Sequence, residues 1–408
     1  MDSNKSDRRR FLKQAAALAG VAAGAGLAAK GQPASAQPQH VHNEPPRRGA
    51  RYSLDHLTHY TPLQDYSGII TPAPVHFVQQ HSAEFPEIDA DQHRLTIHGM
   101  VDRPLSFSMA DLKQLPSVSR VHFLECQGNS SSTIHATRAD PNMGLPVQYI
   151  WGMTSCSEWT GVPLSVLLNE VGVKKEATWL VYEGADPGKF SHTVPLEKAM
   201  DDCLVAYGQN GEPVRVEQGY PIRMIVPGWE GPFSVKYLRH IKVTDQPYHA
   251  WNEAMNHSIP RADLGGKSRW YHFQWAAKSV ITQPSGGMKL PGRGYVQITG
   301  LAWSGGGAVS KVEVSTDGGR SWKEAKLQTP VHTKAHSRFT FDWVWDGEDA
   351  VLMSRCTDDQ GDVQPSKAEL YKLWGITDLE KPSRTTHFNA IQPWFVARDG
   401  SVHDAMFA

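Results

Sequence analysis

The chain has 408 residues, of which 40% are hydrophobic and 20% charged, a composition typical of a globular protein with two or three domains. Its 41 Lys and Arg against 42 Asp and Glu give a formal net charge of −1 at pH 7, without the basic excess of a nucleic-acid-binding protein. The 35 Gly and 27 Pro indicate many turns and short strands.

The first 36 residues have the pattern of an export signal rather than of a folded segment. An Arg8-Arg9 pair precedes a weakly apolar stretch of Ala and Gly, and a small-residue cleavage site ends at Ala36. This pattern predicts a twin-arginine signal at 1–36 and a mature protein in the periplasm. A membrane helix is the alternative, but the stretch is short and rich in Ala and Gly, so it would span poorly. We expect no membrane insertion of the mature chain.

The next segments predict a lead-in and an α+β domain. Residues 37–69 begin with a Pro-, Gln- and His-rich run and are expected to lead into the fold. Over 70–272, short apolar strands alternate with brief helices, without the regular βαβ spacing of a doubly wound sheet. The expected strands cover 93–101, 120–126, 178–184, 220–228 and 241–246, and the expected helices cover 109–115 and 163–171.

A second domain is predicted from residue 273 to residue 395. Here alternating strands are separated by Gly- and Asp-containing turns at the spacing of an all-β, Ig-like sandwich. The DGG sequence at 317–319 predicts a hairpin turn between Val314 and Trp322. Residues 396–408 are expected to form a C-terminal tail.

The cysteines are few and scattered. Without a CxxC pair or a CxxCH motif, we expect neither a disulfide framework nor covalently bound haem. Cys126 ends an apolar strand and begins a Gly/Asn/Ser-rich loop, a place where a soft thiolate could ligate a transition metal or act as a nucleophile. A buried, inert thiol is the alternative that the local sequence favours. His122 lies on the same face of the strand but too far along it to serve as a base.

Basic residues cluster between 215 and 240 around Gly/Pro turns. Guanidinium groups and turn amides both bind phosphate well, so this cluster suits a compact phosphate-bearing ligand. A set of solvated charges at strand edges explains the local sequence equally well. The members are Arg215, Arg223, Lys236, Arg239 and His240.

Eight segments, in order along the chain, carry a resemblance to the sulfite oxidase family of mononuclear molybdenum enzymes. Within it they most resemble the SoxC-type sulfane dehydrogenase subunits of bacterial sulfur oxidation. The segments are FVQQHSAEFPEIDADQHRLTIHG, SRVHFLECQGN, GMTSCSEWTGVPL, YEGAD, GYPIRMIVPGWEG, SVKYL, AKSVITQPSGG and HFNAIQPW.

The resemblance implies a molybdenum–molybdopterin cofactor. The metal would be held by the dithiolene of one molybdopterin and by the thiolate of Cys126. Gln79 and His257 would face the substrate. The residues that would hold the pterin and its phosphate are Gln80, His81, Asp186, Gln218, Arg223, Ser234, Val235 and Lys236.

Three positions depart from the pattern of sulfite oxidases. Gln79 and Ser131 stand where those enzymes carry arginines, and His257, or Asn256, stands in place of their active-site tyrosine. Because a sulfite dianion is best held by cationic groups, these changes favour a larger sulfur substrate. Basic residues nearby, such as Arg138 or Arg261, are the alternative source of positive charge.

The resemblance also implies a reaction and partners. Oxygen-atom transfer would oxidise a sulfane sulfur on a carrier-protein cysteine, a separate c-type cytochrome would take the electrons, and the C-terminal domain would form a homodimer. A sulfite dehydrogenase that acts on free sulfite is the alternative within the same fold. A binding or assembly subunit with a vestigial metal site is the alternative from another class.

Overall fold

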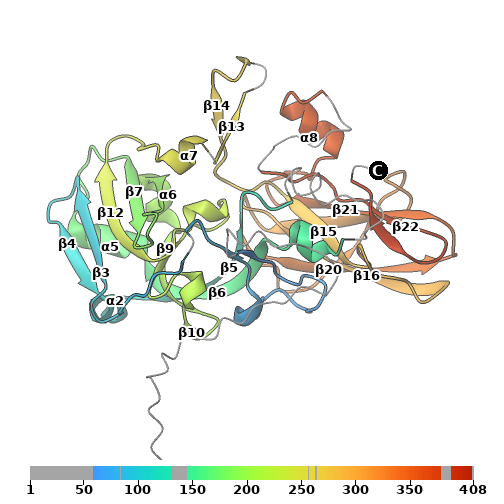
Figure 1. The fold of residues 1–408 in the computed structure, drawn as a ribbon, viewed down its shortest axis with the longest axis horizontal. Helices are drawn as coiled ribbons and strands as arrows, with labels where there is room; N and C mark the ends of the chain where they lie inside the picture. Colours follow the sequence, from blue (N-terminus) through green and yellow to red (C-terminus); the bar gives the residue numbers. More distant parts are fainter. Residues whose placement is uncertain are drawn as a thin grey trace, which may run out of the picture. The chain divides into compact units, whose positions relative to one another are not determined.

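The computed structural model describes residues 58–82, 84–130, 145–255, 257–261, 264–377 and 387–406. The predicted signal at 1–36 therefore lies outside the described residues. An α+β region is followed by an all-β sandwich, as predicted (Figure 1). Within the described part of the chain, no helix is long and apolar enough to span a membrane.

The first region contains two five-stranded sheets. One has the strand order β4-β3-β12-β7-β8, in which β3 and β12 run parallel and the other neighbours antiparallel. Its strands are β3 (Arg94–Gly99), β4 (Leu105–Ser108), β7 (Trp179–Gly184), β8 (Ser191–Pro195) and β12 (Leu238–Thr244). The other sheet has the order β10-β9-β6-β5, with β11 also paired to β9. Its strands are β5 (Val118–Glu125), β6 (Thr154–Pro163), β9 (Leu204–Gln209), β10 (Glu212–Pro213) and β11 (Arg223–Ile225).

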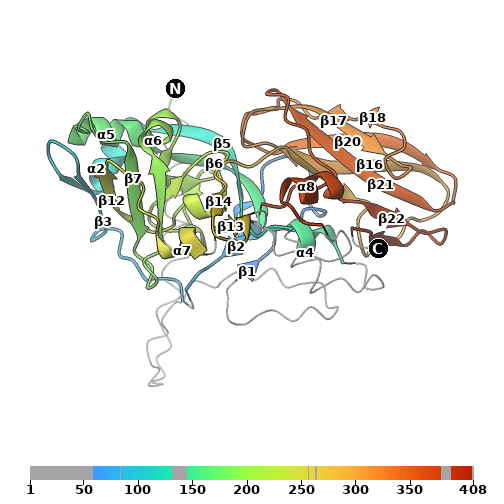
Figure 2. The ribbon, with the colours of Figure 1, turned by 90° about the horizontal axis from the view of Figure 1, so that it is seen from above.

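Short helices and strands complete this region. In α5 the residues at helical spacing, Leu164, Leu167, Leu168 and Val171, are all buried, and the helix ends at Gly172 in the left-handed region (φ +68°). Helices α5 and α6 lie side by side (Figure 2). The helices are α2 (Met109–Gln114), α4 (Val147–Trp151), α5 (Leu164–Val171), α6 (Leu196–Asp201) and α7 (Trp251–Met255), with the 3-10 turns η1 (Ala73–Val75), η2 (Val216–Gln218) and η3 (Gly231–Phe233). The short strands are β1 (Thr58–His59), β2 (Val78–Gln79), β13 (Ser258–Pro260) and β14 (Arg269–Tyr271).

The sandwich consists of a four-stranded and a five-stranded sheet. The first has the order β15-β16-β20-β19 and the second β18-β17-β21-β22-β23. The expected hairpin is confirmed, because β17 and β18 pair antiparallel on either side of the turn at 317–319. The strands are β15 (Lys278–Gln283), β16 (Gly294–Trp303), β17 (Val309–Ser315), β18 (Lys323–Glu324), β19 (Lys326–Leu327), β20 (Ser337–Trp345), β21 (Ala350–Asp358), β22 (Trp394–Val396) and β23 (Val402–Asp404), with one helix, α8 (Lys367–Leu373).

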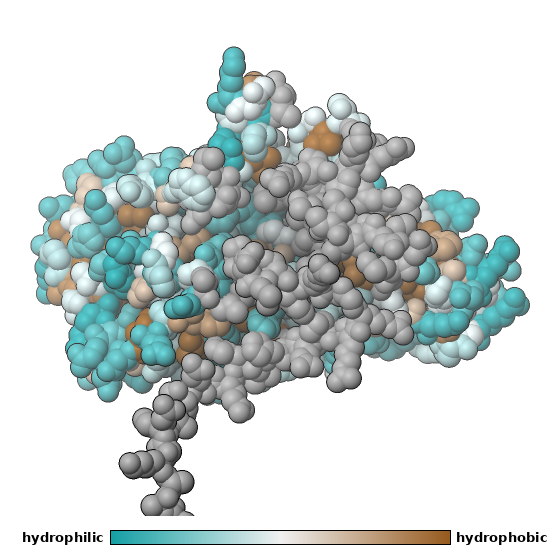
Figure 3. All heavy atoms as spheres, in the orientation of Figure 1, coloured by the Kyte–Doolittle hydropathy of each residue, from teal (hydrophilic) through white to brown (hydrophobic). Residues whose placement is uncertain are grey.

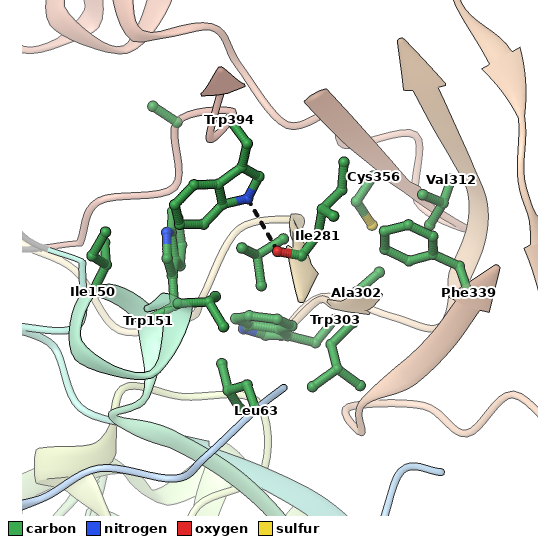
Figure 4. Packing of buried hydrophobic residues seen from close by; sticks show 14 of the residues in the cluster. Leu63, Ile150, Trp151, Ile281, Ala302, Trp303, Val312, Phe339, Cys356 and Trp394 are labelled. Carbon is green, nitrogen blue, oxygen red and sulfur yellow. Dashed lines mark hydrogen bonds between the residues drawn. The ribbon is translucent and has the colours of Figure 1, made fainter. Parts of the chain in front are cut away.

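Large aromatic side chains of the sandwich lie in one buried hydrophobic cluster, which also includes residues of the first region. Trp303, Phe339 and Trp394 are fully buried, and the Trp394 indole donates a hydrogen bond to the Ile281 carbonyl (3.1 Å; Figure 4). On the face shown in Figure 3, apolar residues form separate small groups among hydrophilic ones.

The fold extends beyond the limits expected for its two domains. Leu63, in the expected lead-in, is fully buried, and β1 pairs with β2. At the other end, β22 and β23 form edge strands of the second sheet, so part of the expected tail belongs to the sandwich. Both strands have only three residues, too few for an alternating pattern to be recognised in the sequence.

Candidate active site

Ten of the predicted site residues line one pocket of about 650 Å³, a volume that includes the solvent at its mouth. They come from β2, from the ends of β5 and β7, and from the segment that contains η2, β11 and η3. The ten are Gln79, Gln80, His81, Cys126, Asp186, Gln218, Arg223, Ser234, Val235 and Lys236. Sequence reasoning missed six further lining residues, namely Phe77, Leu124, Phe190, Gly231, Pro232 and Tyr237.

Cys126 directly follows β5, and backbone hydrogen bonds fix its position. Its amide donates to the Met153 carbonyl (2.9 Å), and its own carbonyl accepts from the Asn129 amide (2.9 Å). The Asn129 side chain accepts in turn from the Met153 amide (3.1 Å). Burial raises the pKa of the Cys126 thiol to about 11, so a thiolate here requires a compensating positive charge such as a metal ion.

A glycine allows η3 to lie against the end of β5. A Cβ added to Gly231 would lie 2.6 Å from the Glu125 carbonyl oxygen and 3.3 Å from the Cys126 Cα. Any side chain at this position would push one segment away from the other. Gly231 therefore maintains the close contact that forms the wall of the pocket beside the thiol.

In the described part of the chain, the Lys236 ammonium donates hydrogen bonds to three oxygens, and all three are uncharged. It donates to the backbone carbonyls of Gln79 (3.0 Å) and Glu217 (2.8 Å). A longer bond reaches the side-chain oxygen of Gln80 (3.4 Å). Burial, followed by the nearby charge of Arg223, lowers the pKa of Lys236 to about 7.

Arg223 is buried in a similar way. Its guanidinium donates to the backbone carbonyls of Gln218 and Ser234, each at 2.8 Å. Its Nε is buried and has no hydrogen-bond partner within the described part of the chain. Burial lowers the pKa of Arg223 to about 9. Two neighbouring buried cations whose acceptors are uncharged form a strong site for an anion such as phosphate.

The turn between β7 and β8 supplies another wall of the pocket. Asp186 Oδ1 accepts a hydrogen bond from the Phe190 amide (3.1 Å), and burial raises the pKa of this carboxyl group. The Phe190 ring stacks on the His81 ring, with 4.4 Å between centroids and 6° between planes. The Phe190 ring of this turn thus packs against the His81 ring at the edge of the pocket.

Gln79 is held by the strand that pairs with it. The Thr58 hydroxyl donates to Gln79 Oε1 (3.0 Å), across the β1–β2 pair. This bond occupies the carbonyl oxygen of the side chain, so the amide N–H groups are what Gln79 can offer to a ligand. The group at this position is therefore a neutral donor.

His257 lies next to the pocket but does not line it. Its ring centroid is 5.9 Å from those of both His81 and Phe190. Asn256, the other candidate for the tyrosine position, lies outside the described residues, as do Ser131 and Arg138.

The other basic candidates point elsewhere. Arg215 pairs with Glu212 (3.4 Å), while Arg239 and His240 lie 2.9 and 3.9 Å from Glu183. Only Arg223 and Lys236, of the five clustered basic residues, line the pocket. The solvated-charge alternative fits the other three, which are partly or largely exposed. The Arg261 guanidinium lies over the Trp270 ring, 4.5 Å from its centroid, and is not among the lining residues.

A buried ion pair behind Cys126 could not be found from the sequence. Lys278 Nζ lies 2.6 Å from Glu125 Oε1, and both side chains are fully buried. The Trp303 indole donates to Glu125 Oε2 (2.7 Å), and the ammonium lies 3.9 Å from the centroid of the Trp275 ring. The partners are 153 residues apart, and a lysine at the start of a strand gives no sign that it is buried.

Comparison with known proteins identifies the family. The oxidoreductase molybdopterin binding domain matches residues 82–252, and the Mo-co oxidoreductase dimerisation domain matches residues 271–380. The crystal structure of the sulfane dehydrogenase SoxCD from Paracoccus pantotrophus is similar with a TM-score of 0.80 and 35% sequence identity, over 94% of this chain and 96% of that chain. The chain belongs to the sulfite oxidase family. It is a molybdopterin oxidoreductase, as the sequence predicted.

The chain is also similar to NADH nitrate reductases. The enzyme of Ulva prolifera is 32% identical over 312 residues, and that of Solanum lycopersicum is 32% identical over 354 residues. These alignments cover 68% and 77% of this chain but only 34% and 38% of the reductases. The chain thus spans little more than a third of the length of these relatives.

The pocket fits the molybdenum–molybdopterin cofactor of the family. A soft thiol follows a strand at the pocket wall. Arg223, whose buried Nε has no hydrogen-bond partner among the described residues, lines the same cavity as Lys236. The thiol suits the metal, and the cations suit the phosphate of the pterin. Gln218, whose side chain donates to the Phe77 carbonyl (2.8 Å), and the Ser234–Val235 backbone form the walls between them.

Proposed function

We propose that the chain is the catalytic subunit of a molybdenum-dependent sulfur dehydrogenase, which oxidises a sulfane sulfur carried on a protein cysteine. The similarity to the sulfane dehydrogenase SoxCD, over nearly the full length of both chains, carries this proposal. In the same proposal the protein acts in the periplasm after twin-arginine export. A c-type cytochrome takes the electrons, and residues 271–380 form a homodimer interface.

The charge of the pocket supports the choice of substrate. Gln79 is a neutral donor, and Arg261 lies over Trp270, outside the lining. Arg223 and Lys236 are held by backbone carbonyls at the positions assigned to the phosphate. A free sulfite dianion would gain little from a neutral amide, whereas an uncharged sulfane sulfur requires no cationic partner.

Each group of the chain has a distinct part in this function. The bound cofactor supplies oxygen-atom transfer and accepts two electrons. Cys126 holds the metal at the end of β5, and Arg223 with Lys236 neutralises the phosphate. Gln79 donates hydrogen bonds to the oxygen that sulfur gains, while Phe77, Leu124 and Phe190 exclude water from the pocket wall.

Reduction of cytochrome c by the purified holoenzyme tests the substrate. We expect rapid reduction with a carrier protein whose cysteine bears a persulfide, and little reduction with free sulfite. Gln79→Arg should raise the rate with sulfite at least tenfold, because a cationic group then faces the dianion. Gln360→Arg, at an exposed position of the sandwich, is the control. A higher turnover with sulfite than with the carrier in the unaltered enzyme would overturn the proposed substrate and favour the sulfite dehydrogenase.

A further inference from the structure

Three side chains lie in series behind the wall of the pocket. Glu253 on α7 lies with Oε1 3.2 Å from Nδ1 of His192 on β8. Nε2 of His192 lies 2.8 Å from Nδ1 of His257. All three residues are buried, with exposed fractions of 4%, 0% and 8%. Protons can pass along such a series of contacts, from one imidazole to the next and toward the carboxylate.

The surroundings of Glu253 keep it ionised. Oε1 accepts hydrogen bonds from the amide (2.8 Å) and the hydroxyl (2.7 Å) of Thr193, and Oε2 accepts from the Ala250 amide (2.9 Å). Burial alone would raise the pKa of Glu253, but its contacts with His192 and Thr193 outweigh burial and lower the pKa. A carboxylate with these donors acts as an acceptor towards the next group in the series.

The ionised carboxylate favours one arrangement of the ring protons. Nδ1 of His192 faces Glu253 at 3.2 Å, so we expect the tautomer that carries its proton on Nδ1, which makes Nε2 the acceptor in the contact with His257. His257 then donates through Nδ1–H, and its Nε2 is left as a base. The same polarity occurs wherever a carboxylate orients an imidazole that serves as a general base.

The His257 end of the series lies next to the pocket. The His257 ring is 5.9 Å from both His81 and Phe190, which line the pocket. The titratable groups that face it in the described residues are His192 and His81, with Glu253 behind His192. Burial, followed by the charges of these two histidines, lowers the pKa of His257 well below its usual value, so the ring is neutral before turnover.

We propose that His257, His192 and Glu253 form a proton relay, referred to below as the relay, that accepts a proton released in the pocket. His257 takes the proton at Nε2 and passes its Nδ1 proton to His192, and the resulting imidazolium is stabilised by the Glu253 carboxylate. His192 and Glu253 are positioning residues for His257. The proton returns to water between turnovers.

The relay rests on the proposed function, which supplies the proton. Transfer of an oxygen atom from water to sulfur releases two protons and two electrons for each oxygen gained. The electrons pass singly to the cytochrome haem, which is the oxidant, and the relay accepts one of the two protons. An acceptor close to the pocket prevents that proton from accumulating beside the buried Lys236 and Arg223.

The substitution Glu253→Gln tests the relay, because it removes the charge and keeps the shape of the side chain. Nitrogen-15 chemical shifts of the imidazoles, in protein labelled at histidine, report the position of each ring proton without any substrate. The signals are assigned by their loss in His192→Asn and His257→Asn. We expect the Nδ1–H form of His257 in the unaltered protein and a mixture of both forms in Glu253→Gln.

The control is Glu183→Gln, which removes a partly exposed carboxylate that contacts His240 and does not line the pocket. It should leave the His257 signals unchanged. Unchanged His257 signals in Glu253→Gln as well would overturn the relay. Because this readout uses no substrate, it can fail or succeed independently of the proposed reaction.

The pH profile of kcat provides a second readout. Removing the carboxylate makes the imidazole pair a weaker base, so in Glu253→Gln the acid limb should move to lower pH and the plateau should fall about tenfold or more. A purely structural role of Glu253 would lower kcat at every pH without moving the limb. That outcome would contradict the relay even if the enzyme acts on another sulfur compound.

Discussion

Lys236 shows how a single residue serves both the fold and the site. Its three donors join β2, the η2 turn and its own loop, so the ammonium holds three segments around the pocket. These acceptors carry no net charge, and burial beside Arg223 disfavours the protonated form. An anion in the pocket would relieve this cost, which explains why a cation is placed there.

Replacing Lys236 should therefore weaken cofactor retention more than it disturbs the fold. We expect Lys236→Met to retain at least tenfold less pterin per chain, since one charge-assisted hydrogen bond contributes about 1.5–3 kcal/mol. The fluorescence of oxidised pterin released from the purified protein measures this. Lys242→Met, at an exposed position of β12, should retain as much pterin as the unaltered protein. Equal retention in both variants would show that Lys236 does not bind the cofactor.

At the scale of secondary structure, the sequence predicted elements whose residues form a regular pattern. The alternation in β3 and the helical spacing in α5 place Leu95, Ile97, Leu164 and Leu168 in one core. The strand that presents Cys126 was also expected at its observed place.

Some elements and contacts could not be predicted. The helix α7 and the strand β22 are too short to show a period. Glu253 meets His192, 61 positions earlier in the sequence, only in the folded chain. The same holds for Lys278 and Glu125. The resemblance to the family supplied the residues that line the pocket, whereas their supporting partners have no local signal in the sequence.

The close contact between η3 and the end of β5 gives a prediction at this scale. Gly231→Ala should displace Cys126, because the new Cβ would lie 2.6 Å from the Glu125 carbonyl oxygen. We expect the holoenzyme to lose most of its bound molybdenum, measured by plasma mass spectrometry.

Gly128→Ala is the matched control, also beside Cys126. Its added Cβ would meet nothing closer than a flexible Met153 methyl group at 4.0 Å, so the metal content should be unchanged. Full metal content in Gly231→Ala would contradict the structural role assigned to this contact.

At the scale of the whole molecule, the Glu125–Lys278 ion pair links the end of β5 to the first strand of the sandwich. Asn129, in the turn after Cys126, also donates to Glu125 (2.8 Å). The strand end that precedes Cys126 and the dimerisation domain therefore share one buried charge pair. A shift of β15 would move Lys278 and its partner Glu125, which directly precedes Cys126 in the sequence.

Breaking this pair should be costly. Lys278→Met leaves the Glu125 charge buried without its cation, and we expect it to lower the free energy of unfolding by about 3–5 kcal/mol in urea titrations. The double variant Glu125→Gln with Lys278→Met should recover part of this loss. Lys311→Met, which breaks a partly exposed pair with Glu313, should cost less than about 1 kcal/mol. A similar small loss for Lys278→Met would show that the buried pair does not stabilise the contact.

The central claim is that the thiolate of Cys126 is the protein ligand of the molybdenum. X-ray absorption at the molybdenum edge counts the sulfur neighbours of the metal directly. We predict three sulfurs in the unaltered holoenzyme, two from the dithiolene and one from Cys126, and two in Cys126→Ser. Cys203→Ser, whose buried thiol contacts the Lys198 carbonyl (3.4 Å), should keep three. Three sulfur neighbours in Cys126→Ser would contradict the account.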